Sequence, residues 1–181
     1  MHFLSNTTWA SVFAAWQREE GSDPAWQAFA REKGFATWAD WRGSAAAKLG
    51  VTSLDWQLFA FDNPQTEIPT LLLGPMKSWQ SRVHNIEGAT FNDLLTIPAE
   101  FDHWSTHPKI LSIIANWPTP TQLIAVHALD TGHLICLEGH HRATAVALAN
   151  RLGRAINFGE ITIAIARVPF LHNQHRVLTN S

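Results

Sequence analysis

The spacing of apolar residues along the first third of the chain is typical of short amphipathic helices. The first predicted helix is capped by Asn6 or Thr7 and runs to about Glu20. Asp23 followed by Pro24 predicts a second helix, because a carboxylate cap and a first-turn proline both favour helix initiation. Thr37 opens a third helix that ends near Gly50. These segments predict a helical N-terminal module over residues 1–55.

From Trp56 onward the pattern includes extended segments as well as helices. Strands are predicted at residues 56–60, 68–73, 123–129, 133–137 and 161–168, and helices at 91–95, 108–117 and 140–152. Asp130-Thr131-Gly132 joins two of these strands as a hairpin. The tail that carries His172, His175 and Arg176 is predicted to be peripheral. Residues 56–181 therefore predict an α+β domain with a small mixed sheet and flanking helices.

Composition narrows the class of protein. The 13 basic and 15 acidic residues give a formal charge of -2, which provides no general basic field for a nucleic-acid backbone. The longest nearly apolar run, residues 110–129, is broken by prolines and polar residues, whereas a membrane helix needs roughly 18 apolar residues. Cys136 is the single cysteine, so an internal disulfide is impossible. We expect a cytoplasmic protein that neither crosses a membrane nor binds nucleic acid.

Tryptophan is unusually frequent for a chain of this length. There are nine tryptophans and no tyrosine, and five of the tryptophans lie within the first 42 residues. We interpret them as packing between helices, because tryptophan buries a large area and a base-stacking surface would also need interleaved Lys and Arg. The same helices could instead form the surface for a homodimer or a protein partner.

The strongest chemical signal is the segment Glu138-Gly139-His140-His141-Arg142, between a predicted strand and a predicted helix. The first backbone N–H groups of a helix have no partner within it, and the helix dipole makes that end positive. Glycine lets a ligand approach the backbone, and an arginine can clamp an anion through two hydrogen bonds. This turn therefore predicts a phosphate or carboxylate site, with pairing of Arg142 to Glu138 as the structural alternative.

The run Glu138-Gly139-His140-His141-Arg142-Ala143-Thr144-Ala145, after a hairpin strand and at the start of a helix, resembles the ParB/sulfiredoxin-like superfamily. The turn is most similar to that of the ParB-like free serine kinases. The resemblance covers about residues 65–168 and leaves out the helical segment before residue 50. It implies that nucleotide phosphates bind at the turn, through Gly139, His140, His141 and Arg142 and no further. Thr144, within the same helix, is an additional candidate for phosphate binding.

Two departures from the superfamily limit what the resemblance implies. Sulfiredoxins have a reactive cysteine in this turn, whereas this chain has His140 there and Cys136 inside the strand. Partition proteins have a Gly-Glu-Arg-Arg-type turn and a following DNA-binding helical domain, and neither is visible in this sequence. Sulfinic-acid reduction and DNA partition are therefore not expected.

The resulting hypothesis is a nucleotide-dependent phosphotransferase that acts on a small hydroxyl-bearing molecule with ATP, ADP or CTP and Mg²⁺. Glu138 is the candidate base, and His140 and His141 are further catalytic candidates. Lys77 and Arg82 could hold a second phosphate or an acidic substrate. The alternatives are a non-catalytic nucleotide-sensing or protein-interaction module and, third, a ParB-like nuclease.

No resident metal site is expected. His103 and His107 are four residues apart and could share a helix face, but Pro108 favours an extended conformation at His107. No further ligands occur at a recognisable zinc spacing, and the chain has no P-loop or dinucleotide-binding glycine motif.

Overall fold

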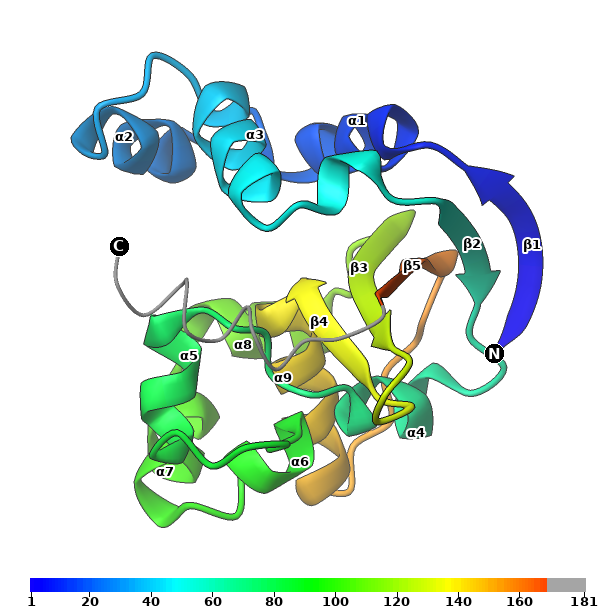
Figure 1. Ribbon diagram of the computed structural model, residues 1–181. Helices are drawn as coiled ribbons and strands as arrows, with labels where there is room; N and C mark the ends of the chain where they lie inside the picture. Colours follow the sequence, from blue (N-terminus) through cyan, green and yellow to red (C-terminus); the bar gives the residue numbers. More distant parts are fainter. Residues whose placement is uncertain (169–181) are drawn as a thin grey trace.

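The computed structural model describes residues 1–168 of the chain (Figure 1). His172, His175 and Arg176, which the sequence pattern places in a peripheral tail, lie outside the described residues. The described part is an α+β fold built on a mixed sheet of five strands in the order β1-β2-β5-β3-β4. The expected fold class is therefore confirmed at this level.

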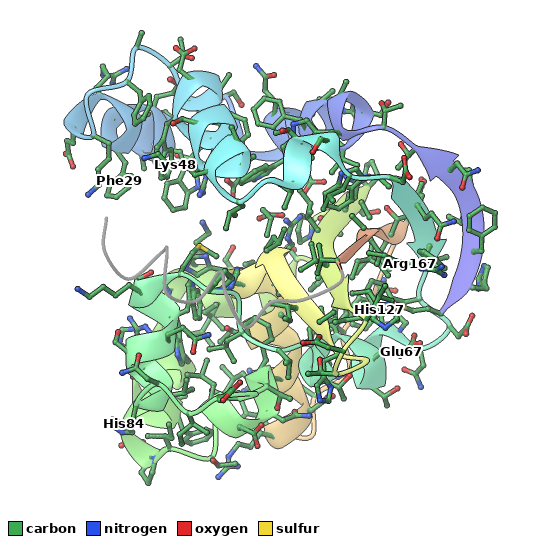
Figure 2. All side chains as sticks on the ribbon, viewed as in Figure 1. Phe29, Lys48, Glu67, His84, His127 and Arg167 are labelled. Carbon is green, nitrogen blue, oxygen red and sulfur yellow. The ribbon has the colours of Figure 1, made fainter. Side chains whose placement is uncertain are left out.

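The strands of the sheet come from both ends of the described chain. They are β1 (His2–Thr7), β2 (Trp56–Ala60), β3 (Thr121–Ala128), β4 (Leu134–Glu138) and β5 (Ile161–Val168). The pair β3 and β5 is parallel and the other neighbours are antiparallel. His127 and Arg167 are register partners in the parallel pair, and Figure 2 shows their side chains in the same part of the sheet. The antiparallel pairing of β3 with β4 confirms the predicted hairpin.

The N-terminal helices follow the predicted capping signals. They are α1 (Trp9–Glu20), α2 (Pro24–Glu32) and α3 (Trp38–Lys48). Asp23 accepts a hydrogen bond from the N–H of Ala25, and Thr37 forms a capping box with Asp40. The first helix is capped by Thr8 and not by Asn6 or Thr7 as predicted, because the preceding residues extend a strand.

The remaining helices follow β2 in the chain, and α9 is the longest of them. They are α4 (Pro64–Glu67), α5 (Lys77–Gln80), α6 (Phe91–Leu94), α7 (Pro98–Thr106), α8 (Pro108–Ala115) and α9 (His140–Arg151), with 3-10 turns at Val51–Ser53, Ile68–Thr70 and Ser81–Val83. Thr90 caps α6 through a capping box, as expected from its position before Phe91. None of the helices in the described residues has the length and apolar character needed to cross a bilayer.

The sheet separates two hydrophobic clusters. One face carries Leu123 and Ala125 and packs against α6, α8 and α9. The alternate residues Ile124 and Val126 point to the other face, where Trp16 and the rest of the cluster from α1 and α3 cover them. Figure 1 shows α1, α2 and α3 together on one side of the sheet and α5 to α9 on the other. The N-terminal helices therefore share a core with the sheet.

Two local predictions are wrong. Residues 2–7 form the edge strand β1, which the sequence pattern did not indicate because this strand is exposed on nearly all of its residues. Residues 68–73 begin as a 3-10 turn, and only Leu72 forms isolated bridges, to Thr90 and Ile135. The apolar character of that segment reflects burial of Ile68, Leu71 and Leu73 and not a strand.

Candidate functional site

The turn between β4 and α9 requires the glycine that the sequence places there. Gly139 has φ of +106°, a backbone conformation that residues with a side chain rarely adopt. A Cβ atom at this position would lie 2.8 Å from Cγ of Leu123. Gly139 thus lets the strand end at Glu138 and the helix begin at His140, with no other residue between the two elements.

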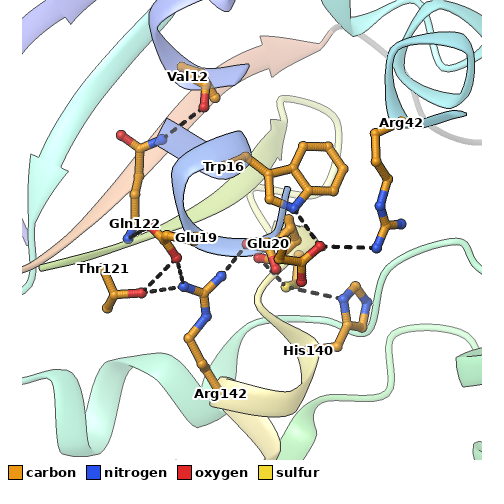
Figure 3. A network of polar contacts seen from close by, with 11 residues as sticks. Val12, Trp16, Glu19, Glu20, Arg42, Thr121, Gln122, His140 and Arg142 are labelled. Carbon is orange, nitrogen blue, oxygen red and sulfur yellow. Dashed lines mark hydrogen bonds and ion pairs between the residues drawn. The ribbon is translucent and has the colours of Figure 1, made fainter. Parts of the chain in front are cut away.

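Arg142 lies in the first turn of α9 and is bonded to other residues of the protein. Its guanidinium forms ion pairs with Glu138 and Glu19 and also donates to Oγ1 of Thr121 (Figure 3). The Thr121 hydroxyl donates to Glu19 at 3.0 Å, and the N–H of Gln122 donates to Glu19 at 2.8 Å. We call Glu19, Thr121, Glu138 and Arg142 the turn network. The structural alternative for Arg142, pairing with Glu138, is therefore what the structure shows.

A second guanidinium lies beside the turn network. Arg42 of α3 forms an ion pair with Glu20 at 3.2 Å, and the indole N–H of Trp16 donates to the same carboxylate at 3.0 Å. The guanidinium carbon lies 4.0 Å from the ring centroid of Trp41. Within residues 1–168, Nε of Arg42 is buried and has no hydrogen-bond acceptor.

The turn network contains the carboxylates of Glu19 and Glu138 but only the guanidinium of Arg142. This excess of negative charge affects the pKa of Glu138. Glu138 is 8% exposed. Burial raises the pKa of Glu138 to about 8, Arg142 opposes that shift, and the neighbouring carboxylates Glu20 and Glu19 add to it. Burial alone would lower the pKa of Arg142, but Glu138 and Glu19 together raise it. Arg142 therefore stays charged, while Glu138 can exchange a proton near neutral pH.

His140 serves the packing of the turn. Its Nε2 accepts a hydrogen bond from the N–H of Gly74 at 3.1 Å, and its Nδ1 lies 3.8 Å from Sγ of Cys136. Burial lowers the pKa of His140 to about 3, so the ring is neutral with its proton on Nδ1. Both ring nitrogens have partners in the core, and His140 does not line the adjacent cavity described below. We correct the expectation of a catalytic or phosphate-binding His140.

The same packing makes Cys136 unreactive. Its thiol is fully buried and donates to the backbone oxygen of Glu138 at 3.2 Å. Burial raises the pKa of this thiol well above its ordinary value, so the reactive thiolate does not form at neutral pH. That the protein does not reduce sulfinic acids stays a prediction.

His141 faces a different environment from His140. Its ring lies 5.5 Å from Trp79 and 6.3 Å from His107, centroid to centroid. Burial lowers the pKa of His141 to about 3, and Lys109 adds to the effect. The neutral ring can donate or accept a hydrogen bond, and it lines the cavity in front of α9.

That cavity, here called the polar cavity, has a volume of about 820 Å³. It lies between the C-terminal end of α1, the start of β3, α8 and the N-terminus of α9. Its charged lining residues are Arg18, Lys109, Arg142, Glu19, Glu20, Asp23, Glu138 and Glu160. Gly139, His141 and Arg142 contribute the end of α9, which no side chain caps. Helix N–H groups without a helical partner therefore lie at this cavity.

Two cations of the polar cavity have no ion pair among residues 1–168. These are Arg18 of α1 and Lys109 of α8, both exposed at the rim. Lys109 also lies 5.2 Å above the ring of Trp26, so it connects α8 with α2. These side chains can contact a ligand without breaking an internal bond.

The remaining predicted site residues lie elsewhere. Thr144 is fully buried and donates to the backbone oxygen of His140 at 2.8 Å, so we correct its expected phosphate role. Arg82 pairs with Glu100 at 2.8 Å and lies over Trp104, which leaves it unavailable as a second phosphate site. Lys77 lines a separate cavity between α3 and α5. The structure thus brings together Glu138, Gly139, His141 and Arg142 only.

Sequence reasoning missed the residues that complete the site. Glu19, Thr121, Arg18 and Lys109 come from segments far from the turn in sequence. The charged run at the end of α1 looks like an ordinary solvated helix end, and no spacing rule connects it with a turn 123 residues later. Only the position of α1 over the start of β3 makes it part of the site.

Neither a metal centre among the described residues nor a similar known protein was found. Within residues 1–168 no group of three or more His, Cys, Asp or Glu residues has a geometry that could hold a metal ion. His107 has the extended conformation that Pro108 predicts, with φ of -72° and ψ of 119°. Comparisons with protein-family models, with curated proteins and with solved structures found no match.

Proposed function

We propose that this protein is a nucleotide-dependent phosphotransferase that acts on a small hydroxyl-bearing molecule and holds nucleotide phosphates in the polar cavity. The observation that carries the proposal is the cavity of about 820 Å³ that opens onto the uncapped N-terminus of α9. This volume is in the range of ligand sites, and a helix N-terminus attracts phosphate through its N–H groups and dipole. The resemblance of the turn to that of the nucleotide-binding members of the ParB/sulfiredoxin-like superfamily supports the same assignment.

The charges of the polar cavity specify how the nucleotide would bind. Arg142 is paired with Glu138 and Glu19, so Arg18 and Lys109 are the cations available to phosphates. Asp23 and Glu160 lie in the same lining and would repel a free polyphosphate. We therefore expect the ligand to be the Mg²⁺ complex of ATP, ADP or CTP. Mg²⁺ usually needs only one or two carboxylates besides the phosphates, which this lining can supply, and it would neutralise charge on the transferred group.

Glu138 is the group best placed to accept the proton of the hydroxyl acceptor. It lines the polar cavity, and its ion pair with Arg142 holds the carboxylate in one orientation. Because burial raises the pKa of Glu138 to about 8, the ionised base becomes more populated as the pH rises towards that value. We expect kcat/KM to rise with pH and to level off above about 8.

The binding part of the proposal is tested by melting temperature. ATP, ADP, CTP, GTP and inorganic phosphate are added with and without Mg²⁺, because a ligand of the folded state raises the melting temperature. We expect a shift with one nucleotide in the presence of Mg²⁺, lost in the double variant Arg18→Ser with Lys109→Ser. Arg154→Ser, an exposed arginine outside the polar cavity, is the matched control. No shift with any nucleotide would refute the proposal in favour of an interaction module.

The catalytic part is tested by phosphoryl transfer to a panel of small alcohols, hydroxy amino acids, sugars and nucleosides. Glu138→Gln keeps the size of the side chain and removes the base. We expect this variant to retain the nucleotide-induced melting shift and to lose transfer by at least about 100-fold, the usual contribution of a general base. Full turnover in Glu138→Gln would show that another group accepts the proton.

A further inference from the structure

A second cavity also borders Glu138. It has a volume of about 470 Å³ and lies between α3, the N-terminal part of α1 and the segment Pro75–Ser78. We call it the aromatic cavity because Trp9, Trp16, Phe29, Phe35 and Trp41 are among its lining residues. Among the residues that line the two cavities, Glu138 alone is shared.

The rings of the aromatic cavity offer flat apolar surface to a ligand. Trp41 and Phe29 lie 5.1 Å apart, centroid to centroid, and Phe29 remains 36% exposed. Trp16 and Trp41 hold the guanidinium of Arg42 between them, with distances of 4.8 and 4.0 Å to the ring centroids. Such a surface favours a planar apolar ring, which can pack against the aromatic side chains that remain accessible.

The charged side chains that line the aromatic cavity are mostly positive, which favours an anionic ligand over a cationic one. Lys33, Lys48, Lys77 and Arg42 line it, against Glu138 as the one carboxylate of the lining. The three lysines are exposed, and none has an ion pair within the described chain. Figure 2 shows Phe29 and Lys48 on the arm formed by α2 and α3, towards the gap that separates this arm from α5. The lysines and the rings therefore combine positive potential with apolar surface.

Arg42 provides an independent indication of a ligand. Its Nη2 bonds Glu20, but its Nε is buried and has no acceptor among residues 1–168. A buried N–H without a partner costs stability. Arg42 lines the aromatic cavity, and an anionic oxygen there would satisfy this donor once the side chain turns towards it.

We propose that the aromatic cavity is a second binding site, specific for a small anion with a planar aromatic body. Aromatic carboxylates, sulfonates and phosphate monoesters belong to this class. The binding itself does not depend on the proposed phosphotransfer. That a hydroxyl-bearing ligand here is the acceptor, next to Glu138, rests on the proposed function.

The test compares two dyes in the absence of nucleotide. Anilinonaphthalene sulfonate is a planar aromatic anion, and N-phenylnaphthylamine has the same rings without the charge. Energy transfer from tryptophan reports binding of both dyes. We expect saturable binding of one sulfonate dye per chain, about 10-fold tighter than the neutral dye, because the rim lysines attract only the anion. Equal affinities, or no saturable binding, would overturn the proposal.

Variants locate the dye within the protein. The double variant Lys48→Ser with Lys77→Ser should bind the sulfonate dye about 5- to 10-fold more weakly and the neutral dye unchanged, since it removes rim charge only. Lys109→Ser, in the polar cavity, is the matched control and should leave both affinities unchanged. An unaltered sulfonate affinity in the double variant, or an equal loss in Lys109→Ser, would place the dye outside the aromatic cavity. Cooperative melting of each variant at the wild-type temperature establishes that the fold is intact.

Discussion

The β4–α9 turn and the rims of the two cavities use charge in opposite ways. Arg142 in the turn is 8% exposed and is fully engaged with Glu138, Glu19 and Thr121. Lys109 and Lys48 on the rims are exposed and have no ion pair in the described residues. The motif residues therefore build and position the site, whereas the rim residues remain free to contact ligands. The following predictions test that division from the largest expected effect to the smallest.

Arg142→Met should cause the largest loss of stability. The substitution leaves the buried carboxylate of Glu138 and the partly buried carboxylate of Glu19 without their shared cation, and breaking a buried ion pair typically costs about 3 to 5 kcal/mol. Urea unfolding followed by circular dichroism measures the free energy of unfolding. Arg154→Met, at an exposed arginine, should change it by less than about 0.5 kcal/mol. If the two variants are equally stable, the turn network does not stabilise the fold.

Gly139→Ala should be the next most harmful change. The new Cβ meets Leu123 at 2.8 Å, and the positive φ is unfavourable for alanine. Strain and overpacking together predict a loss of about 3 kcal/mol. Gly153→Ala is the matched control, because its φ of +64° is also positive but no atom lies within 4 Å of the added Cβ. The control should lose only about 1 kcal/mol in the same unfolding experiment. Similar losses in both variants would mean that Leu123 moves away freely.

Acid should destabilise the fold through His140. The pKa of this histidine is lowered to about 3 in the folded state, from an ordinary value of 6.5. The unfolded chain therefore binds a proton that the folded chain does not, so stability is complete above pH 6.5 and falls as the pH decreases towards 3. The expected slope from this one group is about 1.4 kcal/mol per pH unit.

The variant His140→Gln isolates that effect, because the amide oxygen of glutamine reaches the position of Nε2 and can still accept from the N–H of Gly74. Its unfolding free energy should depend less steeply on pH between about 4 and 6 than that of the wild type, by one proton. His84→Asn, at an exposed histidine with a left-handed backbone that asparagine tolerates, should keep the wild-type slope. An unchanged slope in His140→Gln would show that the ring is not buried as a neutral group.

Lys109→Ala should have the smallest effect on stability. Its side chain is exposed and makes only a ring contact with Trp26, so the unfolding free energy should change by less than about 0.5 kcal/mol. The nucleotide-induced melting shift should nevertheless decrease, because the polar cavity loses one of its two unpaired cations. A large loss of stability with an unchanged nucleotide-induced melting shift would show that Lys109 stabilises the fold and does not bind nucleotide.

Local signals in the sequence predicted the parts of the fold that depend on near neighbours. Thr37, Thr90 and Asp23 each identified a helix start, because a cap bonds to N–H groups two or three residues away. The hairpin before α9 was predicted because its turn and its alternating strands lie within 18 residues. Strand β1 was missed, since its partner β2 lies about 50 residues later and its own side chains are exposed.

The sequence by itself determined the backbone of the site, because Gly139 has the conformational freedom that a direct strand-to-helix turn needs. It also indicated basic side chains at the start of α9, where a helix favours negative charge, so that the run His140-His141-Arg142 predicts a neighbouring anion. Only the tertiary structure shows that Arg142 pairs with the carboxylates of Glu138 and Glu19. Glu19 lies 123 residues from Arg142, and their attraction depends on spatial distance and on burial, neither of which is encoded in sequence spacing.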